Sequence, residues 1–343
     1  MAFSSSSMSG KQAAAQGQRP SQYYPAFFES LPSLQDKTVV ITGCSRGLGY
    51  VTALTVAQKG GSVIMLNRPS ERSQQVLEQL QEATKEQEGS TKQRHHAIDC
   101  DLLSFESVRQ ACQKVQDLTR ETGINVLCNN AGIMLQPDEA SQDGYDITAS
   151  TNMLSHFVIT QQLFPSLQKA SAKNKKSPSR IVTMSSASGY GGPPLDVRFF
   201  EQRGGSLGGA PASYQRYHQT KLANLLFTSA LHDRFQLAQN NNTNILALAC
   251  TPGVCGTDMF THATTVMNGQ PADTSMVPSV EDGVMAQLKC IFLADVTSGQ
   301  VWGPGRNGEL VCTPLEPPLI LIDETSKEQL WEACEKAVGK FNI

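Results

Sequence analysis

The sequence predicts an α/β domain built on a doubly wound parallel sheet with helices on both faces. Short apolar runs rich in Val and Ile are typical of strands that are buried on both faces of such a sheet. These runs alternate with segments of helical spacing, and the first run ends in a glycine-rich turn. Alternating strands and helices favour right-handed crossovers and therefore parallel strands.

The first predicted strand covers residues 39–41, and a helix follows from Tyr50 after the glycine-rich turn at residues 42–49. A second apolar run at residues 62–66 completes a strand–helix–strand unit. Residues 70–94 are dense in Glu, Gln, Lys and Arg, which indicates an exposed helix followed by a loop.

The rest of the chain repeats this alternation. Further strands are predicted at residues 96–103, 125–128, 180–184 and 244–250, and helices from residue 108 and at residues 152–167 and 214–237. Two segments, residues 188–212 and 258–280, show no periodicity. Long irregular segments inside a compact domain are often functional, so we expect both to border one substrate pocket.

The composition and charge of the chain indicate which partners, metal sites and location to expect. A net charge of -3 gives no electrostatic reason to expect nucleic acid or an anionic membrane as a partner. No apolar run approaches the roughly 20 residues of a transmembrane helix. The nine cysteines are scattered, and neither they nor the histidines show a metal-binding spacing, so we expect no disulfide framework and no metal site. A cytoplasmic protein is the expectation that follows.

Residues 1–36 are predicted to form a disordered tail whose aromatic end packs on the domain, and residues 37–343 to form a single domain. Residues 1–28 contain no acidic residue and carry a run of serines, which resembles an organelle transit peptide. Import through this tail is therefore the alternative to a cytoplasmic location.

The glycine-rich turn predicts a dinucleotide site. It lies between a strand and a helix N-terminus, where backbone N–H groups attract phosphate. Gly43 tolerates unusual dihedral angles, and Gly47 and Gly49 bear no side chain that would hold a pyrophosphate or the sheet away. A Rossmann-like fold is the consequence. Taken alone, the turn could also be a simple connection.

Two arginines indicate the form of the cofactor. The second predicted strand ends at Asn67 and Arg68, without the acidic residue that would bind an adenosine ribose and repel a 2′-phosphate. Arg46 and Arg68 can form charge-assisted contacts with that phosphate, so we predict NADP(H). The alternative interpretation is that both are solvated surface arginines.

The expected chemistry rests on Tyr217 and Lys221. Four positions apart in a predicted helix, they project from one face, and a nearby ammonium lowers the pKa of a phenol toward useful acid–base strength. Ser185 and Ser186 end the preceding strand at the edge of the sheet where ligands bind. Either serine could present its hydroxyl to a substrate.

The chain resembles the short-chain dehydrogenase/reductase family over roughly residues 37–312. The motifs that carry the resemblance follow one another in the family's order: Thr42 to Gly49, Asp101, Asn129 to Gly132, Asn152, Ser186, Tyr217 with Lys221, and Pro252 to Thr257. Within that family, the chain is most similar to the branch of retinol dehydrogenases, WW-domain oxidoreductases and protochlorophyllide reductases. The residues that carry this similarity are 143–145, 155–157, 221–224, 323–325 and 330–332.

The resemblance implies roles for these residues. Tyr217 would donate the proton in carbonyl reduction, Lys221 would hold the nicotinamide ribose and lower the tyrosine pKa, Ser186 would orient the substrate oxygen, and Asn152 would support a proton relay. Besides Gly43, Arg46, Gly47, Gly49, Arg68, Tyr217 and Lys221, the implied cofactor-binding residues are Ser45, Leu48, Asp101, Leu102, Asn129, Ala131, Gly132, Pro252, Val254 and Thr257.

The function expected is therefore NADP(H)-dependent hydride transfer to or from a carbonyl or alcohol on a small apolar substrate. Retinoids, steroids, lipid aldehydes and xenobiotic carbonyls fit this description, and a homodimer is compatible with the sequence. Two alternatives remain open at this point: a catalytically idle NADP-binding regulator, and a reductase of a ring C=C bond. His156 and His218 are expected to be packing or surface residues rather than acid–base groups.

Overall fold

The protein is described by a computed structural model that covers residues 19–84, 94–173, 177–238, 244–315 and 322–343. Within these residues one sheet has the strand order β3-β2-β1-β4-β5-β6-β7-β8. The strands are β1 (Thr38–Thr42), β2 (Ser62–Asn67), β3 (His96–Asp99), β4 (Val126–Asn129), β5 (Ser179–Met184), β6 (Ile245–Cys250), β7 (Gln300–Pro304) and β8 (Leu310–Pro314). All neighbours pair in parallel except β7 and β8, which form an antiparallel hairpin at the edge.

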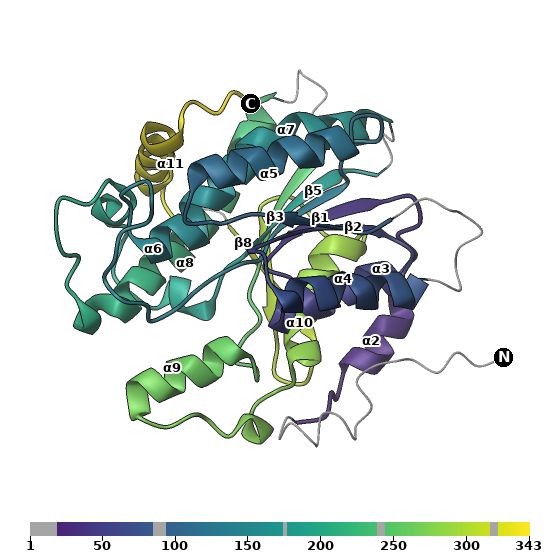
Figure 1. The fold of residues 1–343 in the computed structure, drawn as a ribbon, viewed down its shortest axis with the longest axis horizontal. Helices are drawn as coiled ribbons and strands as arrows, with labels where there is room; N and C mark the ends of the chain where they lie inside the picture. Colours follow the sequence, from purple (N-terminus) through teal and green to yellow (C-terminus); the bar gives the residue numbers. More distant parts are fainter. Residues whose placement is uncertain (1–18, 85–93, 174–176, 239–243, 316–321) are drawn as a thin grey trace.

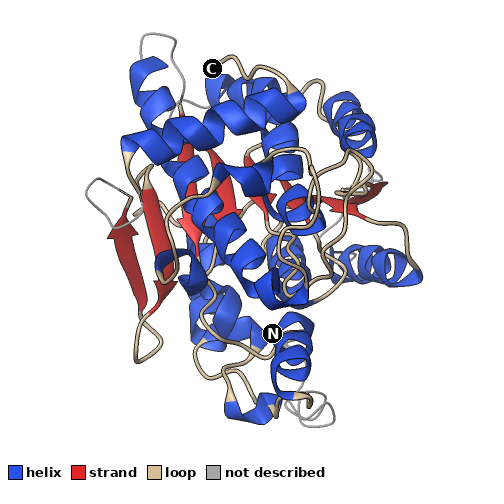
Figure 2. Ribbon diagram, turned by 90° about the vertical axis from the view of Figure 1, so that its left-hand side faces the viewer, coloured by secondary structure: helices blue, strands red, loops and turns tan. Residues whose placement is uncertain are grey.

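Helices cover both faces of this sheet, as Figures 1 and 2 show. Side chains alternate across β1, so that Val40 points into one buried cluster and Val39 and Ile41 into the other. The first cluster includes residues of α5 (Phe105–Leu118), α7 (Ser155–Lys173), α8 (Ser213–Leu237) and α11 (Glu324–Val338); the second includes residues of α3 (Gly47–Gln58), α4 (Glu71–Thr84) and α10 (Val280–Phe292). The predicted Rossmann-like, doubly wound fold is confirmed.

Several helix boundaries depend on capping groups or local geometry. The Ser104 hydroxyl accepts from Ser107 N–H at the start of α5, and the Ser279 hydroxyl accepts from Asp282 N–H at the start of α10. The helix predicted from residue 152 begins differently: α6 (Ile147–Ala149) leads into a π-helical turn, η2 (Ser150–Leu154), before α7. Asn152 therefore lies in the π-helical turn.

The irregular segments contain more structure than their sequences indicate. Residues 258–280 include α9 (Asp258–Asn268) and the 3₁₀ turn η7 (Thr274–Met276). Residues 188–212 carry the 3₁₀ turns η3 (Ala187–Tyr190), η4 (Val197–Phe200) and η5 (Ala210–Ala212). In Figure 1, α9 lies apart from the main body, across from the ends of α6 and α8.

The chain preceding β1 packs on the domain where the structure describes it. Residues 1–18 of the expected tail lie outside the described residues, and α2 (Tyr24–Ser30) follows them. The Asp282 carboxylate on α10 accepts backbone N–H bonds from Gln22, Tyr23 and Tyr24. The buried Tyr24 hydroxyl lies 2.7 Å from Thr55 Oγ1 on α3. No helix in the described part of the chain has the length and apolarity to span a membrane.

Candidate active site

The predicted site residues come together at the carboxyl edge of the sheet. The glycine-rich turn follows β1, Arg68 follows β2, Asn129 ends β4, Ser186 lies two residues past β5, and Pro252 lies two residues past β6. Carboxyl ends of parallel strands share one edge, and ligands bind outside that edge in open α/β sheets. The neighbouring β1 and β4 are the strands at which the chain order reverses.

The geometry of the turn explains its glycines. Gly43 and Gly47 adopt φ angles of 73° and 58°, in the left-handed region that favours glycine. A Cβ on Gly49 would lie 2.2 Å from the Gly43 carbonyl oxygen, so a side chain there would force the turn apart. The N-cap residue Arg46 makes no side-chain cap to α3, so its side chain leaves the first-turn N–H groups of that helix uncapped. This cradle fits a pyrophosphate.

Thr42 and Asn130 hold the turn against the loop that follows β4. Thr42 Oγ1 accepts from the backbone N–H groups of Asn130 at 3.0 Å and Ala131 at 2.9 Å. In return, Asn130 Nδ2 donates to the Thr42 and Gly43 carbonyls at 2.8 and 3.2 Å. Asn130 lies inside the sequence motif of residues 129–132 but was not among the predicted site residues.

His156 connects this network to Asn152. Its Nε2 lies 3.0 Å from Thr42 Oγ1, and its Nδ1 lies 3.1 Å from the Asn152 carbonyl oxygen. Because the Thr42 hydroxyl already accepts two N–H bonds, it donates its own proton to Nε2, and Nδ1–H donates to Asn152. Burial lowers the pKa of His156 to about 3, so the imidazole is neutral. The ring acts here as a connector between two segments.

Asn152 pins the chain beyond Gly132 to α8. Its Oδ1 accepts from Ile133 N–H at 2.8 Å, and its Nδ2 donates to the Ile133 carbonyl and to Thr220 Oγ1, both at 2.9 Å. A Cβ placed on Gly132 would lie 3.4 Å from both Asn152 Oδ1 and Lys221 Nζ. The predicted Asn152, Gly132 and Lys221 are therefore close neighbours.

Tyr217 and Lys221 lie on one side of α8, as their spacing predicts. Lys221 Nζ lies 5.7 Å from the centre of the Tyr217 ring and donates to the Met184 carbonyl at 2.9 Å. The Ser185 hydroxyl donates to the Lys221 backbone carbonyl at 2.8 Å, whereas the Ser186 hydroxyl interacts with the Tyr217 phenol. This arrangement supports Ser186 over Ser185 as the serine that faces a substrate.

The electrostatics of this pair differ from the expectation drawn from the sequence. Tyr217 is 6% exposed, and burial raises its pKa to about 12 although the Ser186 hydroxyl acts in the opposite direction. Burial also lowers the pKa of Lys221 to about 8. Removal from water is thus the largest influence on the pKa of each group, and Tyr217 is a protonated phenol at neutral pH.

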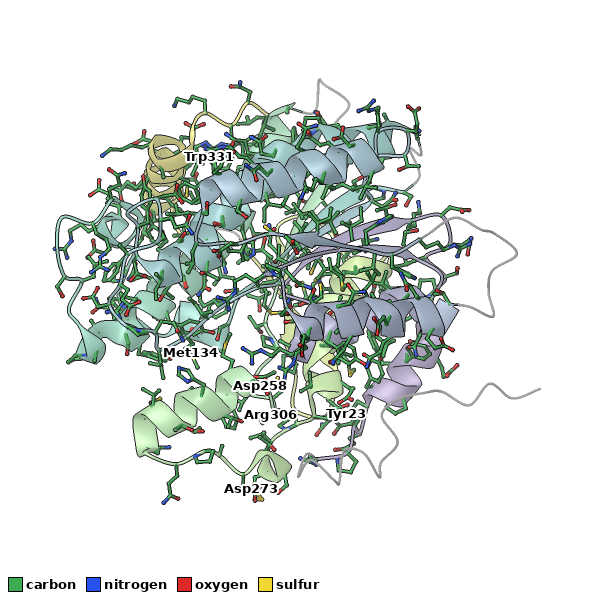
Figure 3. The ribbon with its side chains drawn as sticks, viewed as in Figure 1. Tyr23, Met134, Asp258, Asp273, Arg306 and Trp331 are labelled. Carbon is green, nitrogen blue, oxygen red and sulfur yellow. The ribbon has the colours of Figure 1, made fainter. Side chains whose placement is uncertain are left out.

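One arginine of the predicted phosphate site, Arg46, and the neighbouring Arg72 approach a carboxylate. Arg46 Nη1 lies 2.9 Å from Asp258 Oδ2, and Arg72 Nη1 lies 3.7 Å from the same oxygen. Arg68 is exposed at the end of β2. Arg72 was not predicted, because the charge-rich segment around it gave no sign that the first turn of α4 approaches the glycine-rich turn. Figure 3 shows Asp258 at the end of α9 that is nearer the sheet.

The remaining predicted residues lie around this centre. Thr257 caps α9, and its Cγ2 would be 3.8 Å from a Cβ on Gly47. Val254 is 58% exposed. Asp101 Oδ1 accepts from Leu103 N–H at 3.0 Å, so Asp101 and the buried Leu102 form the turn between β3 and α5. In the described residues, no group of three or more His, Cys, Asp and Glu side chains is arranged to hold a metal ion.

Comparison with known proteins identifies the family. The family model described as short chain dehydrogenase matches residues 37–196. An uncharacterized oxidoreductase of Schizosaccharomyces pombe is 32% identical over 69% of this chain and 66% of its own length. Retinol dehydrogenase 13 of Homo sapiens is 33% identical over 68% of this chain and 63% of its own length, and polyprenol dehydrogenase of Homo sapiens is 29% identical over 67% and 64%. This chain thus covers slightly less than two thirds of each of these relatives.

Solved structures agree on the fold. An uncharacterized protein from Mycobacterium paratuberculosis has a TM-score of 0.66 and 28% identity, covering 92% of this chain and 98% of its own. A short chain dehydrogenase from Shigella flexneri complexed with NADP has a TM-score of 0.58 and 21% identity, covering 80% and 99%. The chain belongs to the short-chain dehydrogenase/reductase family of oxidoreductases, and its relatives include retinol dehydrogenases, as the motifs indicated.

Proposed function

We propose that this protein transfers a hydride between NADP(H) and a carbonyl or alcohol on a small apolar substrate. The observation that carries the proposal is the arrangement of Ser186, Tyr217 and Lys221 beside Gly132, at the sheet edge that also carries the glycine-rich turn. Relatives named retinol and polyprenol dehydrogenases support an apolar alcohol or aldehyde as the substrate class.

Each residue has a defined task in this proposal. The glycine-rich turn would hold the pyrophosphate of the dinucleotide, and the bound cofactor would supply the hydride. Tyr217 donates its phenolic proton to the carbonyl oxygen as the hydride reaches the carbon, and the Ser186 hydroxyl orients that oxygen. Lys221 holds the nicotinamide ribose, and Asn152 keeps the segment after Gly132 in place. Burial raises the pKa of Tyr217 to about 12, so at neutral pH the phenol carries the proton that carbonyl reduction consumes.

The cationic groups near Asp258 support the phosphorylated cofactor. Arg46 and Arg72 both approach one carboxylate oxygen of Asp258, and this supports a common anion position for the two side chains. A 2′-phosphate would gain charge-assisted contacts from them and from Arg68. Structural neighbours were solved with NADP and NADPH, which is consistent with this choice.

A turnover assay over a panel of retinoids, steroids and linear aldehydes, with NADPH and NADH side by side, tests the proposal. We expect reduction of at least one apolar carbonyl, with NADPH preferred by roughly tenfold or more for each arginine contact. Arg68→Asp should erase or reverse that preference. NADPH binding without turnover on any substrate would instead favour the idle regulator, and equal use of both cofactors would contradict the arginine assignment. A cytoplasmic location and a homodimer stay predictions from the sequence.

A further inference from the structure

Two charged side chains that the proposed reaction does not use, Asp138 and the buried Arg216, hold the segment of residues 203–209. The Asp138 carboxylate, 9% exposed, lies 2.5 Å from Arg203 Nη2 and accepts from the Ser206 hydroxyl at 2.6 Å. It also accepts from the Leu207 and Gly209 backbone N–H groups, both at 2.8 Å. Asp138 therefore accepts hydrogen bonds from four groups of this segment.

Arg216 donates hydrogen bonds to backbone carbonyls of the same segment. This side chain is fully buried on α8, one residue before Tyr217. Its Nη1 donates to the Gly209 carbonyl at 2.7 Å, its Nη2 donates to the Gln136 carbonyl at 2.8 Å, and its Nε lies 3.3 Å from Asp146 Oδ2. One guanidinium thus joins three separate parts of the chain to the helix that carries the proposed proton donor.

The turn held by Arg216 is strained. Leu135 is buried and adopts a φ angle of 54°, in the left-handed region that residues other than glycine rarely adopt. The residues on both sides of it are fixed: the Gln136 carbonyl accepts from Arg216, and Gln136 Nε2 donates to the Met134 carbonyl at 2.8 Å. A strained backbone conformation persists only where other contacts hold it in place. Here the hydrogen bonds of Arg216 and of the Gln136 side-chain amide do so.

This turn lies next to the proposed site. It follows Ile133, which Asn152 holds on both its N–H and its carbonyl. At its other end, Gln136 Nε2 lies 3.4 Å from His262 Nε2 on α9. Figure 3 shows Met134 at the margin of the main body that faces α9. The turn therefore extends from Asn152 in the proposed site toward α9.

We propose that Asp138 and Arg216 form a clamp that fixes residues 203–209 and the turn at residues 134–136 as one preformed wall of the substrate pocket. The wall opposite is α9, in which Ala263 is the buried residue. At its first residue, Asp258 pairs with Arg46, and each of these two side chains is more than 60% exposed. The clamp makes the first wall rigid, so it sets which apolar substrates place their carbonyl against Tyr217. Asp138 and Arg216 are positioning residues, and this inference rests on the proposed function.

The clamp predicts a selective loss of activity. Asp138→Asn keeps the shape of the side chain but removes its charge, and Arg216→Met removes the donors. Either change should lower kcat/KM about tenfold or more for a bulky apolar aldehyde, whose position depends on the wall, and less than about threefold for a short aldehyde. Arg216→Lys should lie between wild type and Arg216→Met. An equal loss on both aldehydes would show a merely structural role and overturn the proposal.

A second measurement does not depend on catalysis. Amide hydrogen exchange at Leu207 and Gly209 should quicken about tenfold or more in Asp138→Asn, since the acceptor of their hydrogen bonds loses its charge and one of its two oxygens. Unchanged exchange would overturn the clamp even in an active enzyme, whereas faster exchange in a protein without turnover would leave the clamp standing and reject the proposed function. Should Arg216→Met fail to fold, Asp138→Asn decides the question alone.

Matched controls lie farther along α8. Asp233 pairs with the buried Lys327 at 2.5 Å, and Arg234 packs over the Trp331 ring at 3.8 Å. Asp233 comes 16 residues after Tyr217 in the same helix, about 24 Å along its axis. Asp233→Asn and Arg234→Met should leave the ratio of kcat/KM for the two aldehydes and the exchange of Leu207 and Gly209 as in wild type.

Discussion

At the scale of single residues, Tyr217 shows how burial selects a protonation state. Its phenol is protonated because removal from water raises its pKa to about 12, and the Lys221 ammonium is itself destabilised by burial. A group in this state is ready to donate a proton. Oxidation of an alcohol requires the phenolate, so that direction is expected to gain from a rising pH.

Tyr217→Phe is expected to lower turnover by a factor of about 10² to 10⁴, the contribution typical of a positioned proton donor, while NADPH affinity stays within about twofold. The hydroxyl is lost but the ring keeps its packing. Steady-state kinetics and a fluorescence titration of NADPH measure the two effects. Tyr214→Phe is the control, because Tyr214 is 48% exposed and its ring centre lies 6.3 Å from that of Tyr217. A dead Tyr214→Phe beside an active Tyr217→Phe would reverse the assignment.

At the scale of elements, α9 is held to the main body by exposed polar contacts. The Arg46–Asp258 pair, at 2.9 Å, joins its first residue to the glycine-rich turn. The same arginine is proposed to contact a 2′-phosphate. On that proposal the Asp258 carboxylate and the 2′-phosphate would compete for Arg46, and cofactor binding would be connected to the position of α9.

Asp258→Asn should tighten NADPH binding by up to about fivefold, because an exposed ion pair contributes at most about 1 kcal/mol. NADH affinity should not change, and the gain should shrink at high salt as the charges are screened. Isothermal titration with both cofactors at two salt concentrations measures this. Asp117→Asn, which removes another exposed Asp–Arg pair at 2.8 Å, serves as the control. Weaker NADPH binding in Asp258→Asn would contradict the competition.

At the scale of the whole molecule, two neutral buried histidines contribute to the response of stability to acid. His156 accepts from the Thr42 hydroxyl at Nε2, and His95 accepts from Val63 N–H at Nδ1. Burial lowers their pKa values to about 3 and about 4. Below about pH 6.5 these two histidines bind protons in the unfolded chain but not in the folded chain. Their contribution to the free energy of unfolding is therefore complete above that pH and is lost as the pH falls toward the folded-state pKa values.

Wild type should therefore lose on the order of 2 kcal/mol of unfolding free energy at pH 5 for each of these histidines. His156→Gln removes one titrating group, so its stability should fall less steeply between pH 7.5 and pH 5, by about that amount. Urea unfolding at the two pH values provides the measurement. His262→Gln, an exposed histidine on α9, should retain the wild-type slope. Identical slopes for wild type and His156→Gln would contradict this account.

Much of the molecule followed from local patterns in the sequence. The alternation of apolar runs and helical spacing predicted the parallel sheet, because strands buried on both faces need continuous apolar residues. The glycine-rich turn and the Tyr217–Lys221 spacing placed two parts of the site, because a turn with positive φ and a four-residue helical spacing are properties of neighbouring residues. No comparable local pattern in the sequence predicted the antiparallel β8 or the π-helical turn at Asn152.

The sequence by itself determined the family, the order of strands and helices and the residues expected at the sheet edge. Only the tertiary structure decided that His156 joins Thr42 to Asn152, that Arg72 and Arg46 share Asp258, and that Arg216 holds Gln136 and Gly209. It also decided the direction of the Tyr217 pKa shift. The physical reason is that these contacts, and the loss of water around a buried group, depend on which distant segments meet, which short-range spacing does not encode.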